Sequence, residues 1–153
     1  MRKVFAACVC VLFMSVAQAV SPTGSTRQQI EPLLDEMTSA ANAHDTDRYL
    51  VPYLHEPSLI FVINGTLIHG WKDLHDQQLK WWNNGASDAV YTLRGTPEFT
   101  VLSPKVVVVT KPLASRRTSS DGSVRSSEFV LTMVWQKLAQ GWRIVVAHES
   151  TVH

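Results

Sequence analysis

Cysteine is almost absent from this sequence. The chain of 153 residues contains two, Cys8 and Cys10, and both stand near its start. If the opening segment is removed, as its composition indicates, the remaining chain has no cysteine and forms no internal disulfide. A chain of this length can be stabilised by its hydrophobic core alone, so we expect an ordinary packed domain.

The opening segment has the three parts of a secretory signal peptide. Arg2-Lys3 is basic, Val4–Val16 is a short apolar run, and Ala17-Gln18-Ala19 has the small residues of a cleavage site. The run is shorter than the roughly 20 residues that span a bilayer, which argues against a transmembrane anchor. We expect residues 1–19 to be removed, residues 20–153 to form one domain, and the protein to be periplasmic or secreted.

Neither sign of charge is in surplus. Without Arg2 and Lys3 the 14 basic side chains fall to 12, against 13 acidic ones. This balance provides no basic surface for nucleic acid. No segment after the leader is apolar enough to span a membrane. We therefore expect neither nucleic acid nor a membrane span among the partners of the processed chain.

Motifs for cofactors and metals are also lacking. The sequence has no phosphate-binding loop, no nucleophile elbow and no HExxH pattern. His44, His69 and His75 do not have the close-paired spacing of metal ligands. We expect no metal and no cofactor.

Helical spacing of apolar residues predicts a first helix over Ile30–His44, with Pro32 in its first turn. Asp45 is a good cap for a short second helix. A third helix is expected over Trp71–Trp82, with its end at Asn83-Asn84-Gly85.

Most of the remaining chain has the composition of strands. Asn64-Gly65 predicts a tight hairpin, and Ser115–Ser127 is polar enough for an exposed hairpin loop. The valines of Lys105–Thr110 indicate a strand covered on both faces. Helices before strands favour an α+β fold, with three helices packed on the concave face of a curved antiparallel sheet. The expected strands are Ser58–Ile63, Thr66–His69, Val90–Leu102, Lys105–Thr110, Glu128–Lys137 and Gly141–Ser150.

The last strand carries a titratable side chain on an apolar face. Strict alternation places Trp142, Ile144, Val146, His148 and Ser150 together. If this face lines a pocket, the imidazole of His148 is a candidate general acid or base. The alternative is a core histidine that is hydrogen-bonded to a backbone carbonyl or to a tyrosine.

The order of elements and several motifs resemble the SnoaL-like proteins of the nuclear-transport-factor-2-like superfamily, which includes polyketide cyclases and ketosteroid isomerases. The motifs are Ala43-His44-Asp45, Tyr53-Leu54-His55-Glu56-Pro57, the hairpin into Gly70, Trp135-Gln136-Lys137, and Gly141-Trp142-Arg143-Ile144-Val145 with His148. The resemblance implies a cone-shaped fold, a small apolar ligand between sheet and helices, and a homodimer through the outer sheet face. The isomerases have a general-base aspartate on the first strand, whereas Ser58–Ile63 has no carboxylate. This departure argues against steroid isomerisation.

Aromatic side chains come from nearly every expected element and suit either a ligand pocket or an ordinary core. Trp81 and Trp82 are adjacent, so one of them should lie off the buried helix face. His55 and Glu56 stand near the expected pocket rim, where they are catalytic partners or solvated loop residues. The candidate pocket residues are Tyr53, Phe61, Trp71, Trp82, Tyr91, Trp135 and Trp142.

Three functions are consistent with these residues. The first is an exported protein that binds a small hydrophobic molecule. The second is a cofactor-independent lyase, isomerase or cyclase that uses His148 with His55 or Tyr91. The third is a non-catalytic dimeric assembly module, whose apolar outer sheet face would contain Val107, Val109, Val145 and Ala147.

Overall fold

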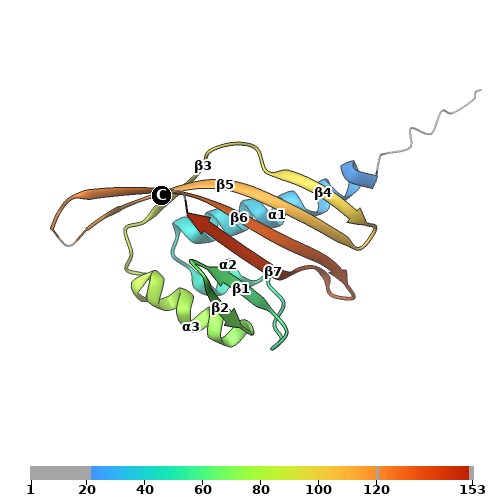
Figure 1. Cartoon of the computed structure of the whole chain (residues 1–153), viewed down its shortest axis with the longest axis horizontal. Coiled ribbons are helices and arrows are strands. Elements are labelled where there is room, and N and C mark those ends of the chain that lie inside the picture. The colour runs from blue at the N-terminus through green and yellow to red at the C-terminus, as the bar shows by residue number, and fades with distance from the viewer. Residues whose placement is uncertain (1–21, 120, 152–153) are drawn as a thin grey trace, which may run out of the picture.

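The computed structural model describes residues 22–119 and 121–151. The expected signal peptide, residues 1–19, lies outside the described residues. Figure 1 shows a curved sheet with α1 running along one face and α3 near the short hairpin β1–β2. The elements are α1 (Pro22–Asn42), α2 (Thr46–Leu50), β1 (Ile60–Ile63), β2 (Thr66–His69), α3 (Trp71–Trp81), the 3₁₀ turn η1 (Asn83–Gly85), β3 (Val90–Leu93), β4 (Glu98–Ser103), β5 (Val106–Thr118), β6 (Val124–Leu138) and β7 (Gly141–Thr151).

The α+β architecture is as expected, and its sheet is mostly antiparallel. The strand order is β2-β1-β7-β6-β5-β3, and β4 also pairs with β5. One pair departs from the expectation, because β1 runs parallel to β7. The β5, β6 and β7 strands are long and form the centre of the sheet.

The first helix begins earlier than the sequence indicated. Because α1 starts at Pro22, Pro32 lies in its interior and not in its first turn. Proline removes one backbone hydrogen bond there, and burial of the helix face offsets this loss. Ile30, Leu34 and Met37 are almost completely buried on that face. Among the described residues, no helix has the combined length and apolar character needed to cross a membrane.

Two local signals are confirmed. The Asp45 side chain caps α2 by accepting a hydrogen bond from the Arg48 backbone N–H at 3.1 Å. Asn64 and Gly65 both have positive φ, 48° and 76°, which is the conformation that a two-residue hairpin turn requires. The turn joins β1 to β2 in register.

The strand predictions needed three corrections. The segment Val90–Leu102 forms two strands, β3 and β4, which both pair with β5. The segment Ser115–Ser127 is mostly strand, because β5 continues to Thr118 and β6 begins at Val124. The valines of β5 are not covered on both faces, since only alternate positions are fully buried.

The predicted outer face of the sheet was also wrong. Val107, Val109 and Ala147 are completely buried on the concave face, against the helices. Strand alternation therefore places Val108 and Val146 on the outer face, where they are half-buried.

Candidate functional site

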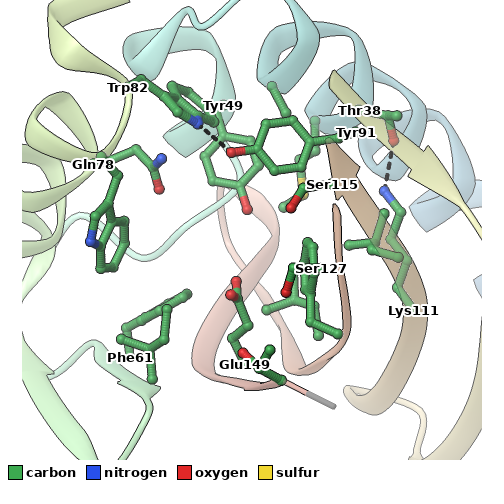
Figure 2. Close-up of a pocket in the computed structure, with 18 of the residues that line it drawn as sticks. Thr38, Tyr49, Phe61, Gln78, Trp82, Tyr91, Lys111, Ser115, Ser127 and Glu149 are labelled. Atoms are coloured by element: carbon green, nitrogen blue, oxygen red, sulfur yellow. Dashed lines mark hydrogen bonds between the residues drawn. The ribbon is translucent and has the colours of Figure 1, made fainter. Parts of the chain in front are cut away.

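A cavity of about 390 Å³ lies between the helices and the concave face of the sheet. This volume is within the ~300–1,000 Å³ typical of small-molecule sites. Figure 2 shows side chains from helices above and from the sheet below that converge on this space. The apolar and aromatic lining residues are Met37, Ala41, Tyr49, Phe61, Ile63, Trp81, Trp82, Tyr91, Leu113, Phe129 and Leu131. The polar ones are Thr38, Asn64, Gln78, Lys111, Ser115, Arg117, Ser127, Glu149 and Thr151.

A β-bulge in β7 brings Glu149 into this cavity. The pairing of β7 with β6 shifts between Ile144 and Val146, so Val145 is an extra residue. An extra residue reverses the alternation of every side chain beyond it. Ile144 before the bulge and Ala147 after it are both fully buried. Glu149, two residues further, therefore points to the same face as Ala147.

The bulge also overturns the predicted position of His148. The alternation in the sequence grouped its side chain with Trp142 and Ile144, but His148 is exposed and does not line the cavity. It lies on the outer face of the sheet, beside Thr132 of β6. The titratable group that β7 contributes to the cavity is thus a carboxyl and not an imidazole.

The carboxyl of Glu149 has apolar neighbours on both adjacent strands. Ile63 of β1 and Leu131 of β6 are its partners in register. Burial raises the pKa of Glu149 to about 7, and the positive charge of Arg117 opposes this rise. A carboxyl with this pKa exchanges its proton readily near neutral pH, as a general acid or base must.

Two tyrosine hydroxyls face the same space. Trp82 Nε1–H donates a hydrogen bond to the Tyr91 hydroxyl at 2.9 Å (Figure 2). Burial raises the pKa of Tyr91, although the bond from Trp82 opposes it. Burial, together with the neighbouring Tyr53, raises the pKa of Tyr49 well above its ordinary value. Both hydroxyls therefore stay neutral and can donate hydrogen bonds to a ligand oxygen.

Lys111 is a buried cation at another side of the cavity. Its residue is 3% exposed, and Nζ donates to Thr38 Oγ1 at 2.6 Å and to the Leu34 backbone oxygen at 3.3 Å. Burial lowers the pKa of Lys111 to about 8, and the charge of Asp35 opposes this fall. Lysine of this kind is still mainly protonated at pH 7.

The acid and the lysine stand in one row across the sheet. Lys111 pairs with Leu131, and Leu131 pairs with Glu149. Neighbouring strands are ~4.8 Å apart, so the two backbones are separated by about 10 Å. None of the ion pairs among residues 22–119 and 121–151 joins them. The cavity therefore presents two separate polar ends with apolar surface between them.

The other predicted catalytic residues lie in different places. Tyr91 lines the cavity. His55 is exposed and outside the cavity, where its ring packs on Trp71 with a centroid distance of 4.4 Å and its Nε2 lies 3.3 Å from the Leu50 oxygen. The structure does not bring His55, His148 and a tyrosine hydroxyl together.

Three of the seven predicted aromatic pocket residues line the cavity, namely Phe61, Trp82 and Tyr91. Trp81 joins them, because α3 ends at Trp81 and Trp82 no longer follows helical geometry. Trp82 is 2% exposed and Trp81 is half-buried. The remaining four, Tyr53, Trp71, Trp135 and Trp142, lie outside the cavity.

Sequence reasoning missed Glu149, Lys111, Tyr49 and Gln78. The sequence does contain a signal for Lys111, because this residue continues the alternation of Val107 and Val109. The expected strand ended at Thr110, one residue too early to include it. No signal in β7 marks Val145 as a bulge. In the described ranges 22–119 and 121–151, no group of three or more His, Cys, Asp or Glu side chains is arranged to hold a metal ion.

Together these features define a class: α+β domains with a curved sheet, helices over its concave face and a ligand-sized cavity between them. The family model described as a SnoaL-like domain matches residues 30–153. The chain belongs to this SnoaL-like family, which confirms the resemblance seen in its motifs. Among curated proteins, none matches the sequence.

Solved structures share the fold at low sequence identity. An NTF2-like protein of unknown function from Shewanella oneidensis MR-1 is 23% identical, with a TM-score of 0.70 over 82% of this chain and 98% of that one. An NTF2-like superfamily protein from Salmonella enterica is 18% identical, with a TM-score of 0.74 over 86% and 94%. The association domain of C. elegans CaMKII is 18% identical, with a TM-score of 0.66 over 84% and 98%. These similarities confirm the nuclear-transport-factor-2-like fold.

Proposed function

We propose that this chain binds one small, mostly apolar molecule in the cavity between its helices and its sheet. The observation that supports this most directly is the cavity itself, whose aromatic walls enclose a few polar groups. Aromatic and aliphatic walls favour apolar ligands through surface burial, and the polar groups fix orientation. The sequence alone led to the same hypothesis, with a partly different set of lining residues.

A thermal-shift screen with steroids, polyketide-like aromatics and terpenoids tests this proposal. A matching ligand should raise the melting temperature of the native chain, since it binds the folded state only. Trp81→Ala should remove the shift because Trp81 lines the cavity. Trp71→Ala is the matched control, a tryptophan of the same helix outside the cavity. If no apolar compound stabilises the protein, the binding function is wrong.

A second candidate function is acid–base catalysis on a carbonyl compound. It is favoured by Glu149, whose carboxyl faces the cavity and has a pKa of about 7. A carboxylate there would remove a proton next to the carbonyl, and Tyr49 or Tyr91 would donate a hydrogen bond to the carbonyl oxygen. Tyr91 thus remains a candidate catalytic residue, as expected from the sequence, and Glu149 takes the acid–base role that was expected of His148.

Deuterium exchange at the carbon next to a bound ketone, followed by NMR, tests this candidate. Exchange should stop in Glu149→Gln and continue in His148→Gln, which changes the neighbouring residue on the opposite face. Exchange that persists in Glu149→Gln would remove Glu149 from the mechanism. Loss in His148→Gln alone would restore the original assignment.

We also propose a homodimer through the outer sheet face. Ile60, Val146, Val134 and Val108 are neighbours in register across four strands of this face, and they form an apolar row that a symmetric partner can cover. The same fold serves as an association domain in C. elegans CaMKII. Light scattering should give a dimer for the native chain and a monomer for Val134→Lys. Val124→Lys, at an exposed position near the hairpin tip, should remain dimeric.

The leader supports export as a further proposal, with residues 20–153 as the mature domain. Protein purified from the periplasm or the medium should begin at Val20 when its N-terminus is sequenced. Ala19→Lys should block cleavage, because the site requires small residues. Recovery of chain that begins at Met1 only in the cytosol would exclude export.

A further inference from the structure

Lys111 places a positive charge inside the cavity without a counter-ion. None of the ion pairs in the described part of the chain includes it. Asp35 acts on it from α1 but is exposed to solvent. Glu149 stands two strands away in the same row. A buried charge that lacks a partner is costly, and a bound anion would remove that cost.

The geometry of Nζ leaves room for such an anion. An ammonium group has three N–H donors, and two of them bind Thr38 Oγ1 and the Leu34 backbone oxygen. The Thr38 hydroxyl itself donates to the Leu34 oxygen at 2.8 Å, which fixes the two acceptors in place. Figure 2 shows Nζ held toward Thr38 beside the cavity. The third donor has no described partner.

The remaining charges around the cavity favour a negative ligand. Arg117 lines the cavity from an exposed position and adds positive charge. Glu149 is the carboxyl among the lining residues, and below pH 7 it is mostly protonated because burial raises its pKa to about 7. Under mildly acidic conditions the site is therefore positive at both Lys111 and Arg117.

We propose that the molecule bound in this cavity is an amphipathic acid, whose carboxylate accepts a hydrogen bond from Lys111 Nζ and whose apolar body lies on Leu131 and Trp81. This inference rests on the proposed binding function and gives its ligand class. A hydrogen bond between two charged groups is about twice as strong as a neutral one. Leu131, between the two polar residues in the row, is apolar and 3% exposed.

Calorimetric titration with matched acids and alcohols tests the ligand class. The probes are 2-naphthoate against 2-naphthylmethanol, and octanoate against 1-octanol. At pH 6 each acid should bind the native chain at least about tenfold more tightly than its alcohol. Lys111→Met should abolish this preference and leave alcohol binding in place, whereas the exposed Lys105→Met should keep it.

Equal affinity of acid and alcohol for the native chain would overturn the inference, as would a preference that survives Lys111→Met. Failure of all four probes to bind would instead count against both the acid ligand and the binding function. Stabilisation by neutral ligands alone in the thermal-shift screen would keep the binding function and reject the acid.

A pH series on the native chain decides the question even if Lys111→Met does not fold. Between pH 6 and pH 9 Glu149 becomes negative and Lys111 loses its proton, since burial places their pKa values at about 7 and about 8. The other ionisable groups that face this site are Arg117, Asp35, Tyr49 and Tyr91. Burial raises the pKa values of the two tyrosines above their ordinary value. Acid affinity should fall at least about tenfold, and alcohol affinity should change little. A flat acid profile would overturn the inference.

Discussion

The two ends of the concave sheet face differ sharply, although the same three strands form both. At one end Val107, Trp135 and Ile144 stand in one cross-strand row, and all three are completely buried. At the other end the corresponding row is Lys111, Leu131 and Glu149, and it lines the cavity. The first row is packed as a core, and the second presents charged groups to a space large enough for a ligand.

The bulge at Val145 stands between these two ends. It lies directly beyond Ile144, the β7 residue of the packed row. Bulges are frequent next to functional sites, because they re-aim the side chains that follow. In this molecule the bulge lets one strand supply an apolar residue to the core and an acid to the cavity. In β7 the difference between the two ends is therefore a matter of local register. In β5 it comes from the residue itself, since Lys111 continues the regular alternation of Val107 and Val109.

The largest expected effect comes from truncating an aromatic residue of β6 at each end of the concave face. Trp135→Ala should lower the free energy of unfolding by about 3–5 kcal/mol, because it opens a void in the packed row. Phe129→Ala should cost less, since Phe129 already lines the cavity and its side chain borders that empty space. Urea unfolding of the two variants measures both values.

The native chain and Val124→Ala, at an exposed position of the same strand, are the references for this pair. Equal losses for Trp135→Ala and Phe129→Ala would mean that the cavity end is packed as tightly as the core end. The contrast between the two ends would then be wrong.

An intermediate effect is expected from the charge of Glu149. Its pKa rises from 4.5 to about 7 on folding, so the folded state holds the proton more tightly than the unfolded state. The resulting stability is complete below pH 4.5 and is lost as pH rises through 7, by up to about 3 kcal/mol. The difference in unfolding free energy between pH 4.5 and pH 8 should therefore be smaller in Glu149→Gln than in the native chain.

His148→Gln is the matched control for this pH dependence, since it changes the exposed neighbour on the opposite face. Its unfolding free energy should still fall between pH 4.5 and pH 8, because this variant retains Glu149. A Glu149→Gln variant with the same pH dependence as the native chain would show that the carboxyl is solvated and that the cavity end is open to water.

The packed end was predictable from sequence only in part, since Val107 was expected on the outer sheet face but is completely buried in the packed row. Trp135 and Ile144 follow plain alternation, and the helix, hairpin and capping signals around them are local. The cavity end depends on where strands end and on how they pair. Lys111 was not predicted as a site residue because the expected strand ended at Thr110. Glu149 was not predicted because nothing in the residues around Val145 marks a bulge. Pairing between distant strands decides that register, and a single sequence does not contain the pairing explicitly.

The smallest expected effect is the most direct test of the bulge. Deleting Val145 should restore regular alternation with Ile144, Ala147 and Glu149 still on the concave face. The loss is about 1 kcal/mol, the burial energy of a half-buried valine. NMR titration should then find the pKa of Glu149 still raised.

Deleting Ala147 in place of Val145 is the opposite case. With the bulge kept, His148 should turn toward the cavity and Glu149 toward solvent, so the pKa of Glu149 should return toward 4.5, its value outside the folded protein. If both deletions leave the Glu149 carboxyl buried, the strand can slide to recover its register. Packing at the cavity end would then determine where Glu149 lies, and the bulge would be a consequence of that packing.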